Sequence, residues 1–223
     1  RPPHTEKLVP VHEQPAFASA VGLASLFVAL YYITGPSHLH HPWVDVGVLS
    51  RDAFFSGQWW RVVTAACLHA DLGHVLGNAL FFTILGWGLS ERIGPGFMWS
   101  IWLLSAVAGF GLSLSTSEIL RTLGASGGNF GLLGAIAGHR VHWHQDPLSS
   151  KRSFMRYAGA SLMLLAFTAF DPQSNVRAHV GGFLSGFAMG AILPEKTPTL
   201  SVQVLASSLT TFVLIGAWMW GLP

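Results

Sequence analysis

Long apolar stretches separated by short polar segments run through the whole chain. A helix needs about 20 mainly apolar residues to cross the hydrocarbon of a bilayer. The pattern therefore predicts an all-α polytopic membrane protein with seven spans, of which the fifth is short. The predicted spans are Ala16–Thr34, His74–Ser90, Phe97–Ser115, Ser126–Val141, Tyr157–Phe170, His179–Leu193 and Val202–Gly221.

The composition supports this interpretation. The chain of 223 residues is 51% hydrophobic and only 10% charged, whereas a soluble domain carries about 25% charged residues. This deficit excludes a disordered chain, a nucleic-acid-binding arm and an ordinary cytosolic enzyme. The partners expected are the lipid bilayer and other membrane proteins, with no nucleic acid. The single cysteine, Cys67, excludes an internal disulfide and a multi-thiolate metal site.

The distribution of Lys and Arg between the connections predicts the orientation, because cytoplasmic loops carry an excess of both. The connections on the N-terminal side of the membrane hold Arg1, Lys7, Arg92, Arg140, Lys151, Arg152, Arg156 and Lys196. The opposite connections hold Arg51, Arg61, Arg121 and Arg177. We therefore expect residues 1–15 to form a cytoplasmic tail and the C-terminus to lie outside.

The first loop, residues 35–73, is far longer than a usual connection between helices. Its aromatic residues are Trp43, Phe54, Phe55, Trp59 and Trp60. Such a composition is typical of a segment that lies in the membrane interface, and long loops are often functional. The alternative is an outer loop without a function.

Strongly polar side chains are costly inside a membrane span and are candidates for function. His74 and Asn78 lie on the second span, Ser126 and Asn129 open the fourth, and His179 opens the sixth. At a rise of 1.5 Å per residue, Asn78, Ser126 and His179 lie about 20, 21 and 24 Å above the inner ends of their helices. A hydroxyl, an imidazole and an amide therefore share one level, several Å below the outer surface.

Stripes of glycine indicate which of these spans pack together. They consist of Gly127, Gly131, Gly134 and Gly138 on the fourth span, and of Gly182, Gly186 and Gly190 on the sixth. Small residues at this spacing let membrane helices approach closely. We expect these two helices to be in contact and to bring Ser126 against His179, although glycine stripes alone also occur in ordinary helix packing.

A serine hydroxyl becomes a useful nucleophile when a histidine takes its proton. The second requirement is a set of donors for the developing oxyanion, for which Asn78, His74 and the backbone N–H of Ser126 are candidates. The stretch Gly124–Gly127 places the hydroxyl in a tight turn at the start of a helix, where free N–H groups face bound anions. No aspartate lies at this depth in any span, so the residues favour a dyad over a triad.

These residues resemble the rhomboid family of intramembrane serine proteases. The similar pieces run in order from about Gly57 to Pro194. They are Trp60-Arg61, His69, His74-Val75-Leu76-Gly77-Asn78, Glu91-Arg92, Gly124-Ala125-Ser126-Gly127 with Gly131, and Ala178-His179 with Gly182 and Gly186. The resemblance implies a six-helix catalytic core over residues 16–194, followed by a linker and one additional helix in residues 195–223.

The resemblance also implies a role for each matching residue. Ser126 would be the nucleophile and His179 the general base, with His74, Asn78 and the Ser126 backbone forming the oxyanion hole. The supporting residues implied are Phe130 against the catalytic histidine, Gly124 and Gly127 beside the nucleophile, Trp60 and Arg61 in the first loop, and Gly182 and Gly186 on the sixth span. Asn129 has no counterpart in this pattern.

The resemblance implies hydrolysis of transmembrane segments in a bacterial plasma membrane, with the site open to the outer face and without a metal or other cofactor. A zinc protease would need His-Glu-x-x-His, which is absent, and a two-aspartate protease would need aspartates within the spans. Histidines at 38, 40 and 41 and at 139, 142 and 144 lack carboxylate or thiolate partners for a metal site. The alternatives are a non-catalytic relative that binds membrane clients, and a small transporter or a subunit of a larger membrane assembly.

Overall fold

The structure is a computed structural model that describes residues 15–39, 41–115, 121–143, 174–195 and 197–222, and the single positions 152, 155, 159 and 163. Within this part of the chain the regular elements are helices, and the only β-type pairing is one isolated bridge between Leu49 and Thr122. The all-α class is therefore confirmed. The predicted span Tyr157–Phe170 and the tail before Pro15 lie outside the described ranges.

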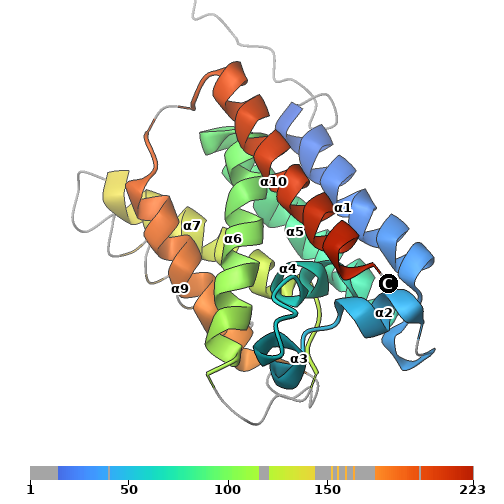
Figure 1. Cartoon of the computed structure of the whole chain (residues 1–223). Coiled ribbons are helices and arrows are strands. Elements are labelled where there is room, and N and C mark those ends of the chain that lie inside the picture. The colour runs from blue at the N-terminus through green and yellow to red at the C-terminus, as the bar shows by residue number, and fades with distance from the viewer. Residues whose placement is uncertain are drawn as a thin grey trace, which may run out of the picture.

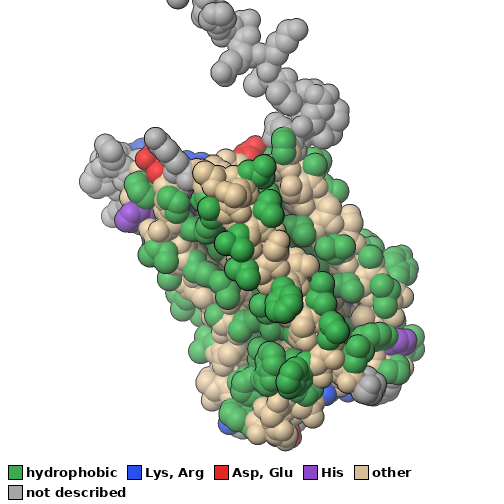
Figure 2. Space-filling model, turned by 45° about the horizontal axis from the view of Figure 1, so that its top comes forward, with side chains coloured by type: hydrophobic (Ala, Val, Ile, Leu, Met, Phe, Trp, Pro, Cys, Tyr) green, Lys and Arg blue, Asp and Glu red, His purple; other side chains and the backbone are tan. Residues whose placement is uncertain are grey.

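Six long helices match six of the predicted spans, with ends that agree to within three residues. They are α1 (Pro15–Thr34), α5 (Leu72–Ile93), α6 (Pro95–Ser113), α7 (Ser126–Trp143), α9 (Val176–Ile192) and α10 (Leu200–Gly221). Four of them, α1, α5, α6 and α10, are long and apolar enough to cross a membrane. Figure 2 shows apolar side chains over the flank of the molecule and charged ones near its two ends.

Capping residues explain why two helices begin earlier than hydropathy alone predicts. The Asp71 carboxylate accepts a hydrogen bond of 2.8 Å from the backbone N–H of His74 at the start of α5. The Asn175 side chain accepts one of 3.0 Å from the N–H of Ala178 at the start of α9. These side chains satisfy N–H groups that the helix itself leaves without a partner. Both helices therefore start several residues before their apolar stretch.

Helix α7 is the central helix of the bundle and is buried continuously from Gly127 to His139. It packs against α5, α6 and α9, as seen in Figure 1. Its glycines replace bulky apolar residues, which lowers its hydropathy while allowing close packing. A buried helix of this kind needs little lipid-facing apolar surface.

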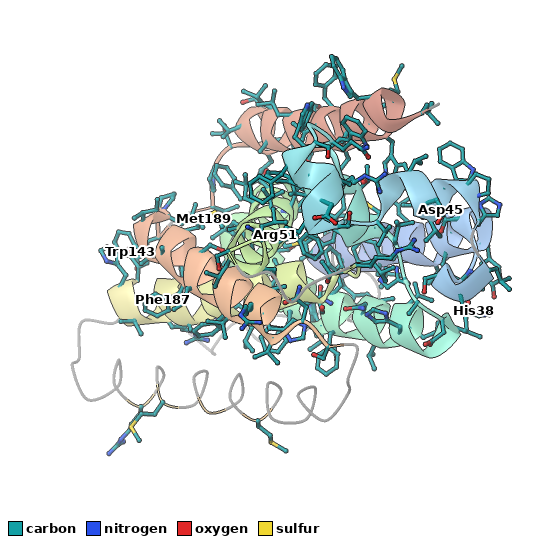
Figure 3. All side chains as sticks on the ribbon, turned by 60° about the horizontal axis from the view of Figure 1, so that its bottom comes forward. His38, Asp45, Arg51, Trp143, Phe187 and Met189 are labelled. Atoms are coloured by element: carbon teal, nitrogen blue, oxygen red, sulfur yellow. The ribbon has the colours of Figure 1, made fainter. Side chains whose placement is uncertain are left out.

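Helices α7 and α9 meet backbone to backbone. A Cβ atom at Gly182 would overlap the carbonyl oxygen of Gly127, and one at Gly186 would overlap that of Gly131. A Cβ atom at Gly138 would overlap the carbonyl oxygen of Phe187, which Figure 3 labels on α9 beside α7. The two glycine stripes therefore form the contact that places the start of α7 against the start of α9.

The first loop is folded into short helices at one end of the bundle (Figure 1). They are η2 (Ser37–Leu39), α2 (Pro42–Gly47), α3 (Arg51–Phe55), α4 (Arg61–Thr64) and η3 (Ala65–Cys67). Arg61 holds this loop together, since its guanidinium donates to the backbone oxygens of Asp45 at 2.8 Å and Val48 at 2.7 Å. Trp60 adds a longer hydrogen bond of 3.4 Å from its indole N–H to the oxygen of Val46.

Helix α10 runs along α6 and contacts the first loop with its C-terminal end (Figure 1). The Gln203 side-chain oxygen accepts from the backbone N–H of Gly96 at 2.8 Å, at the turn between α5 and α6. One helix length away, the ring of Trp218 packs edge-on against that of Trp43, with centroids 5.7 Å apart. The last helix therefore connects the α5–α6 turn to the first loop.

Candidate active site

Ser126 and His179 are joined by a hydrogen bond of 2.8 Å between the serine Oγ and the histidine Nε2. Ser126 is the first residue of α7, and His179 lies in the first turn of α9. The histidine is only 3% exposed. Two helix starts that are far apart in sequence therefore bring together a hydroxyl and a base.

Phe130 covers one face of the His179 ring. It lies one turn after Ser126 on α7, and its ring stacks on the imidazole with centroids 4.5 Å apart and planes inclined by 19°. A near-parallel stack limits rotation of the imidazole about its side-chain bonds. The contact therefore keeps Nε2 directed at the serine.

His74 on α5 lies against the turn that precedes Ser126. Its Nδ1 accepts a hydrogen bond of 3.3 Å from the backbone N–H of Ala70, so the proton of the neutral ring resides on Nε2. That Nε2 faces Gly124, where a Cβ atom would lie 2.9 Å from it. Gly124 has φ of +123°, a conformation that L side chains rarely adopt. The sequence thus provides glycine where the backbone twists and where His74 needs room.

His69 supports this imidazole from the loop before α5. It is fully buried, and its ring meets that of His74 edge-on with centroids 5.2 Å apart. Burial, together with the nearby charge that His74 acquires on protonation, lowers the pKa of His69 to about 3. His69 is therefore neutral at physiological pH and adds no charge beside His74.

The first loop determines where the Ser126 turn lies. Leu49 and Thr122 exchange two backbone hydrogen bonds of 3.1 and 2.8 Å, and the N–H of Gly124 donates to the oxygen of Ala65 at 2.9 Å. The hydrogen bonds of Trp60 and Arg61 lie within the first loop, which in turn bonds to Thr122 and Gly124. Their contribution to the site is therefore indirect.

The N-terminus of α7 supplies unpaired donors next to the serine hydroxyl. The first N–H groups of any helix lack a partner within it, and they form a favourable environment for negative charge. The close approach at this end depends on Gly182, since a Cβ atom there would overlap the carbonyl oxygen of Gly127, whereas one at Gly127 would make only an ordinary contact of 3.4 Å with the carbonyl oxygen of Ala178. The start of α7 therefore packs closely against α9 and is rich in donors.

Asn78 faces the same region from α5. It is buried, and its amide Nδ2 donates to the carbonyl oxygen of His74 at 3.1 Å. The amide of Asn129 on α7 donates in turn to the Asn78 Oδ1 at 3.0 Å and to its backbone oxygen at 3.1 Å. The structure therefore joins α5 and α7 through two amides close to Ser126.

Asn175 was not singled out by the sequence analysis. Besides capping α9, its Oδ1 accepts from the hydroxyl of Ser113 on α6, and its Nδ2 donates to the hydroxyl of Thr122, each at 3.0 Å. It therefore ties α6 and the segment before Ser126 to the start of the helix that carries His179. An asparagine directly before an apolar run was the available signal, because this residue type is favoured at N-caps.

Of the histidine-rich segments, the second lies at the end of α7 away from Ser126. His40 and His144 are outside the described residues, and His139 meets the carbonyl oxygen of Pro194 at 3.4 Å at the far end of α7. Among the residues that the structure describes, no group of three or more His, Cys, Asp or Glu side chains is arranged to hold a metal ion.

Long apolar helices with a hydrogen-bonded Ser–His pair between two helix starts define a polytopic membrane protein. The Rhomboid domain model matches residues 56–196, so the chain belongs to the rhomboid family. The apolar helices and this membership make it a multi-pass integral membrane protein.

Several curated proteins are similar to the chain. Rhomboid protease GluP of Bacillus subtilis (strain 168) is 27% identical over 98% of this chain and 43% of its own length. Rhomboid-like protease 3 of Toxoplasma gondii is 32% identical over 65% of this chain and 55% of its own length. RHOMBOID-like protein 1 of Arabidopsis thaliana is 35% identical over 60% of this chain and 34% of its own length. The chain thus spans about half or less of the length of these relatives.

Proposed function

We propose that this protein is an intramembrane serine endopeptidase that cleaves transmembrane segments of other membrane proteins. The observation that carries the proposal is the 2.8 Å hydrogen bond between Ser126 Oγ and His179 Nε2. This distance lies within the range over which a general base removes the proton of its nucleophile. The names of relatives such as Rhomboid protease GluP agree with it.

In the first step, Ser126 Oγ attacks the scissile carbonyl carbon and transfers its proton to His179 Nε2. A C–O bond forms, the carbonyl π electrons move to oxygen, and a tetrahedral intermediate results. The imidazolium of His179 then gives the proton to the leaving amide nitrogen as the C–N bond breaks. Phe130 keeps the ring in the plane that both proton transfers require.

The oxyanion formed in this step needs donors that are already in place. His74 has its neutral-state proton on Nε2, because Nδ1 accepts from Ala70. Asn78 Nδ2 and the backbone N–H of Ser126 are the other donors of the proposed hole. Together with the N-terminal end of α7, they stabilise negative charge on the carbonyl oxygen.

The second step reverses the chemistry with water. His179 takes a proton from a water molecule, the resulting hydroxide attacks the acyl carbon, and the Ser126 Oγ leaves with the proton returned by His179. The products are a carboxylate and an amine from one peptide bond, and the dyad returns to its starting state. No cofactor takes part in this sequence.

The Lys and Arg distribution supports a cytoplasmic N-terminus and a site open to the outer face. A Bacillus relative that covers 98% of this chain favours a bacterial plasma membrane. We further propose that residues 16–194 form the catalytic core and residues 195–223 a linker and an additional helix. The contacts of α10 with α6 and the first loop suggest that this helix stabilises the core from one side.

The test is cleavage of a single-span model substrate by the protein reconstituted in liposomes. Wild type, Ser126→Ala and Ser56→Ala are compared, because Ser56 is an exposed serine of the first loop. We expect cleavage by wild type and Ser56→Ala and none by Ser126→Ala. A fluorophosphonate that esterifies activated serines should label the same two proteins.

Two outcomes would contradict the proposal. Cleavage by Ser126→Ala at close to the wild-type rate would show that Ser126 is not the nucleophile. Folded wild-type protein that neither cleaves the substrate nor reacts with the fluorophosphonate would instead favour a non-catalytic protein that binds membrane clients.

A further inference from the structure

Asn129 is a buried polar residue on the helix of the proposed nucleophile, one turn from Ser126. It is only 5% exposed. Its Nδ2 bridges two oxygens of one residue on α5, the backbone oxygen of Asn78 at 3.1 Å and the Asn78 Oδ1 at 3.0 Å. The chemistry described above does not use Asn129.

The orientations of both amides follow from their partners. A backbone carbonyl only accepts hydrogen bonds, so the group of Asn129 that faces the Asn78 backbone oxygen must be its NH₂. By the same reasoning, the group of Asn78 that faces the His74 carbonyl oxygen is its NH₂, at 3.1 Å. The Asn78 Oδ1 is then the atom that receives the second hydrogen bond from Asn129.

This pattern leaves the Asn78 amide with one defined polarity. Its oxygen is occupied by Asn129, one N–H is used by the His74 carbonyl, and the second N–H of the NH₂ group is the one that remains for a developing oxyanion. A rotation of the amide by 180° would place NH₂ against the NH₂ of Asn129 and oxygen against the His74 carbonyl oxygen. Both contacts would be repulsive.

Burying an asparagine at position 129 carries an energetic cost. Its own Oδ1 is buried and has no hydrogen-bond partner among the described residues. An unpaired buried oxygen is unfavourable, and an apolar side chain of similar size would avoid it. The NH₂ group, which holds Asn78, is therefore the half of the side chain that explains an asparagine here.

We propose that Asn129 is a positioning residue that keeps the Asn78 amide N–H directed into the oxyanion hole. This inference rests on the proposed protease function. Asn129 acts through Asn78 and does not touch the reacting atoms. It would raise the turnover rate without changing how tightly the substrate helix is bound.

The experiment measures kcat and KM in liposomes, and the rate of fluorophosphonate labelling, for wild type, Asn129→Leu and Asn129→Asp. Leucine preserves the volume and removes the donor. Aspartate preserves the shape but presents only acceptors to two oxygens. Loss of one oxyanion donor costs roughly 10²–10³-fold in kcat, so we expect roughly tenfold for Asn129→Leu and a larger loss, up to that range, for Asn129→Asp. KM should stay unchanged.

The same two substitutions in an Asn78→Ala background separate positioning from simple helix packing. If Asn129 acts through the Asn78 amide, its substitution costs no further kcat once that amide is absent. A purely structural link between α5 and α7 would still lower kcat in this background, because the hydrogen bond to the backbone oxygen of residue 78 is still lost. Such an added loss overturns the inference.

The remaining outcomes are also distinct. If wild type is active and Asn129→Leu turns over equally fast, the positioning role is overturned and the protease function stays intact. Wild-type protein that neither cleaves nor becomes labelled overturns the protease function, and the positioning role with it. A rise in KM at constant kcat assigns Asn129 to substrate binding and likewise overturns the inference.

Discussion

Gly124 lies directly against His74: a Cβ atom at position 124 would be 2.9 Å from the histidine Nε2. The same glycine has φ of +123° and donates its N–H to the Ala65 oxygen of the first loop. Space for the histidine, backbone conformation and loop attachment therefore coincide at one residue, two positions before Ser126.

Gly124→Ala should lower proteolytic turnover at least tenfold. The methyl group displaces the His74 ring from the proposed oxyanion hole, and the positive φ adds strain of order 1–3 kcal/mol. The measurement is kcat in liposomes together with thermal stability. Gly57→Ala is the matched control, because Gly57 also has a positive φ, of +97°, but has open space at its Cβ position. Gly57→Ala should lose stability through the same backbone strain, while its folded protein keeps the wild-type kcat. An equal loss of kcat in both variants would show that displacement of His74 is not the cause.

Gly186→Ala should destabilise the contact between α7 and α9. The added methyl group overlaps the carbonyl oxygen of Gly131, so the helices must separate. Overpacking of this kind costs typically about 1–3 kcal/mol, and the separation should also move His179 away from Ser126. Denaturant titration and fluorophosphonate labelling measure the two effects.

Gly88→Ala provides the comparison for this prediction. Gly88 lies on α5, and a Cβ atom there meets nothing within 4 Å. The higher helix propensity of alanine should leave its stability unchanged or slightly higher. If both variants behave like wild type, the close backbone contact between α7 and α9 is not required for the fold.

The apolar pattern predicts the long helices well because each span must satisfy its own backbone hydrogen bonds in lipid. Six helices therefore end within three residues of their predicted limits. The glycine stripes also predict the α7–α9 contact, since close approach leaves a visible spacing of small residues. Ser126 and His179 could be singled out because polar residues are rare in such segments.

Other features depend on contacts that no local pattern encodes. Helices α2, α3 and α4 have four to six residues each, too few to show a period. Asn175 reads as a helix cap, but its bonds to Ser113 and Thr122 arise only when three segments meet. The sequence shows Asn129 only as an additional amide, and its contact with Asn78 is seen only in the structure.

Asn175→Ala should lower the free energy of unfolding by about 1–3 kcal/mol. It removes a helix cap, which contributes about 1 kcal/mol, and leaves buried hydroxyls of Ser113 and Thr122 with fewer partners. Asn175→Asp should restore most of the loss, because a carboxylate accepts from the Ala178 N–H and from both hydroxyls. Equal stability of the alanine variant and wild type, measured by denaturant titration in detergent, would contradict this assignment.

His69 should make the fold sensitive to acid. Its folded-state pKa of about 3 lies below its ordinary value near 6.5, since burial disfavours the charged ring. Between these two pH values the unfolded chain therefore binds one more proton than the folded chain. The free energy of unfolding is highest above about pH 6.5 and falls as the pH decreases. Between pH 7 and pH 5 this one group lowers the free energy of unfolding by about 2 kcal/mol.

His69→Phe should remove this part of the pH dependence, whereas His38→Phe, at an exposed position, should retain it. Denaturant titrations of the three proteins at both pH values measure the difference, and an unchanged pH dependence in His69→Phe would show that His69 is not held neutral in the folded state.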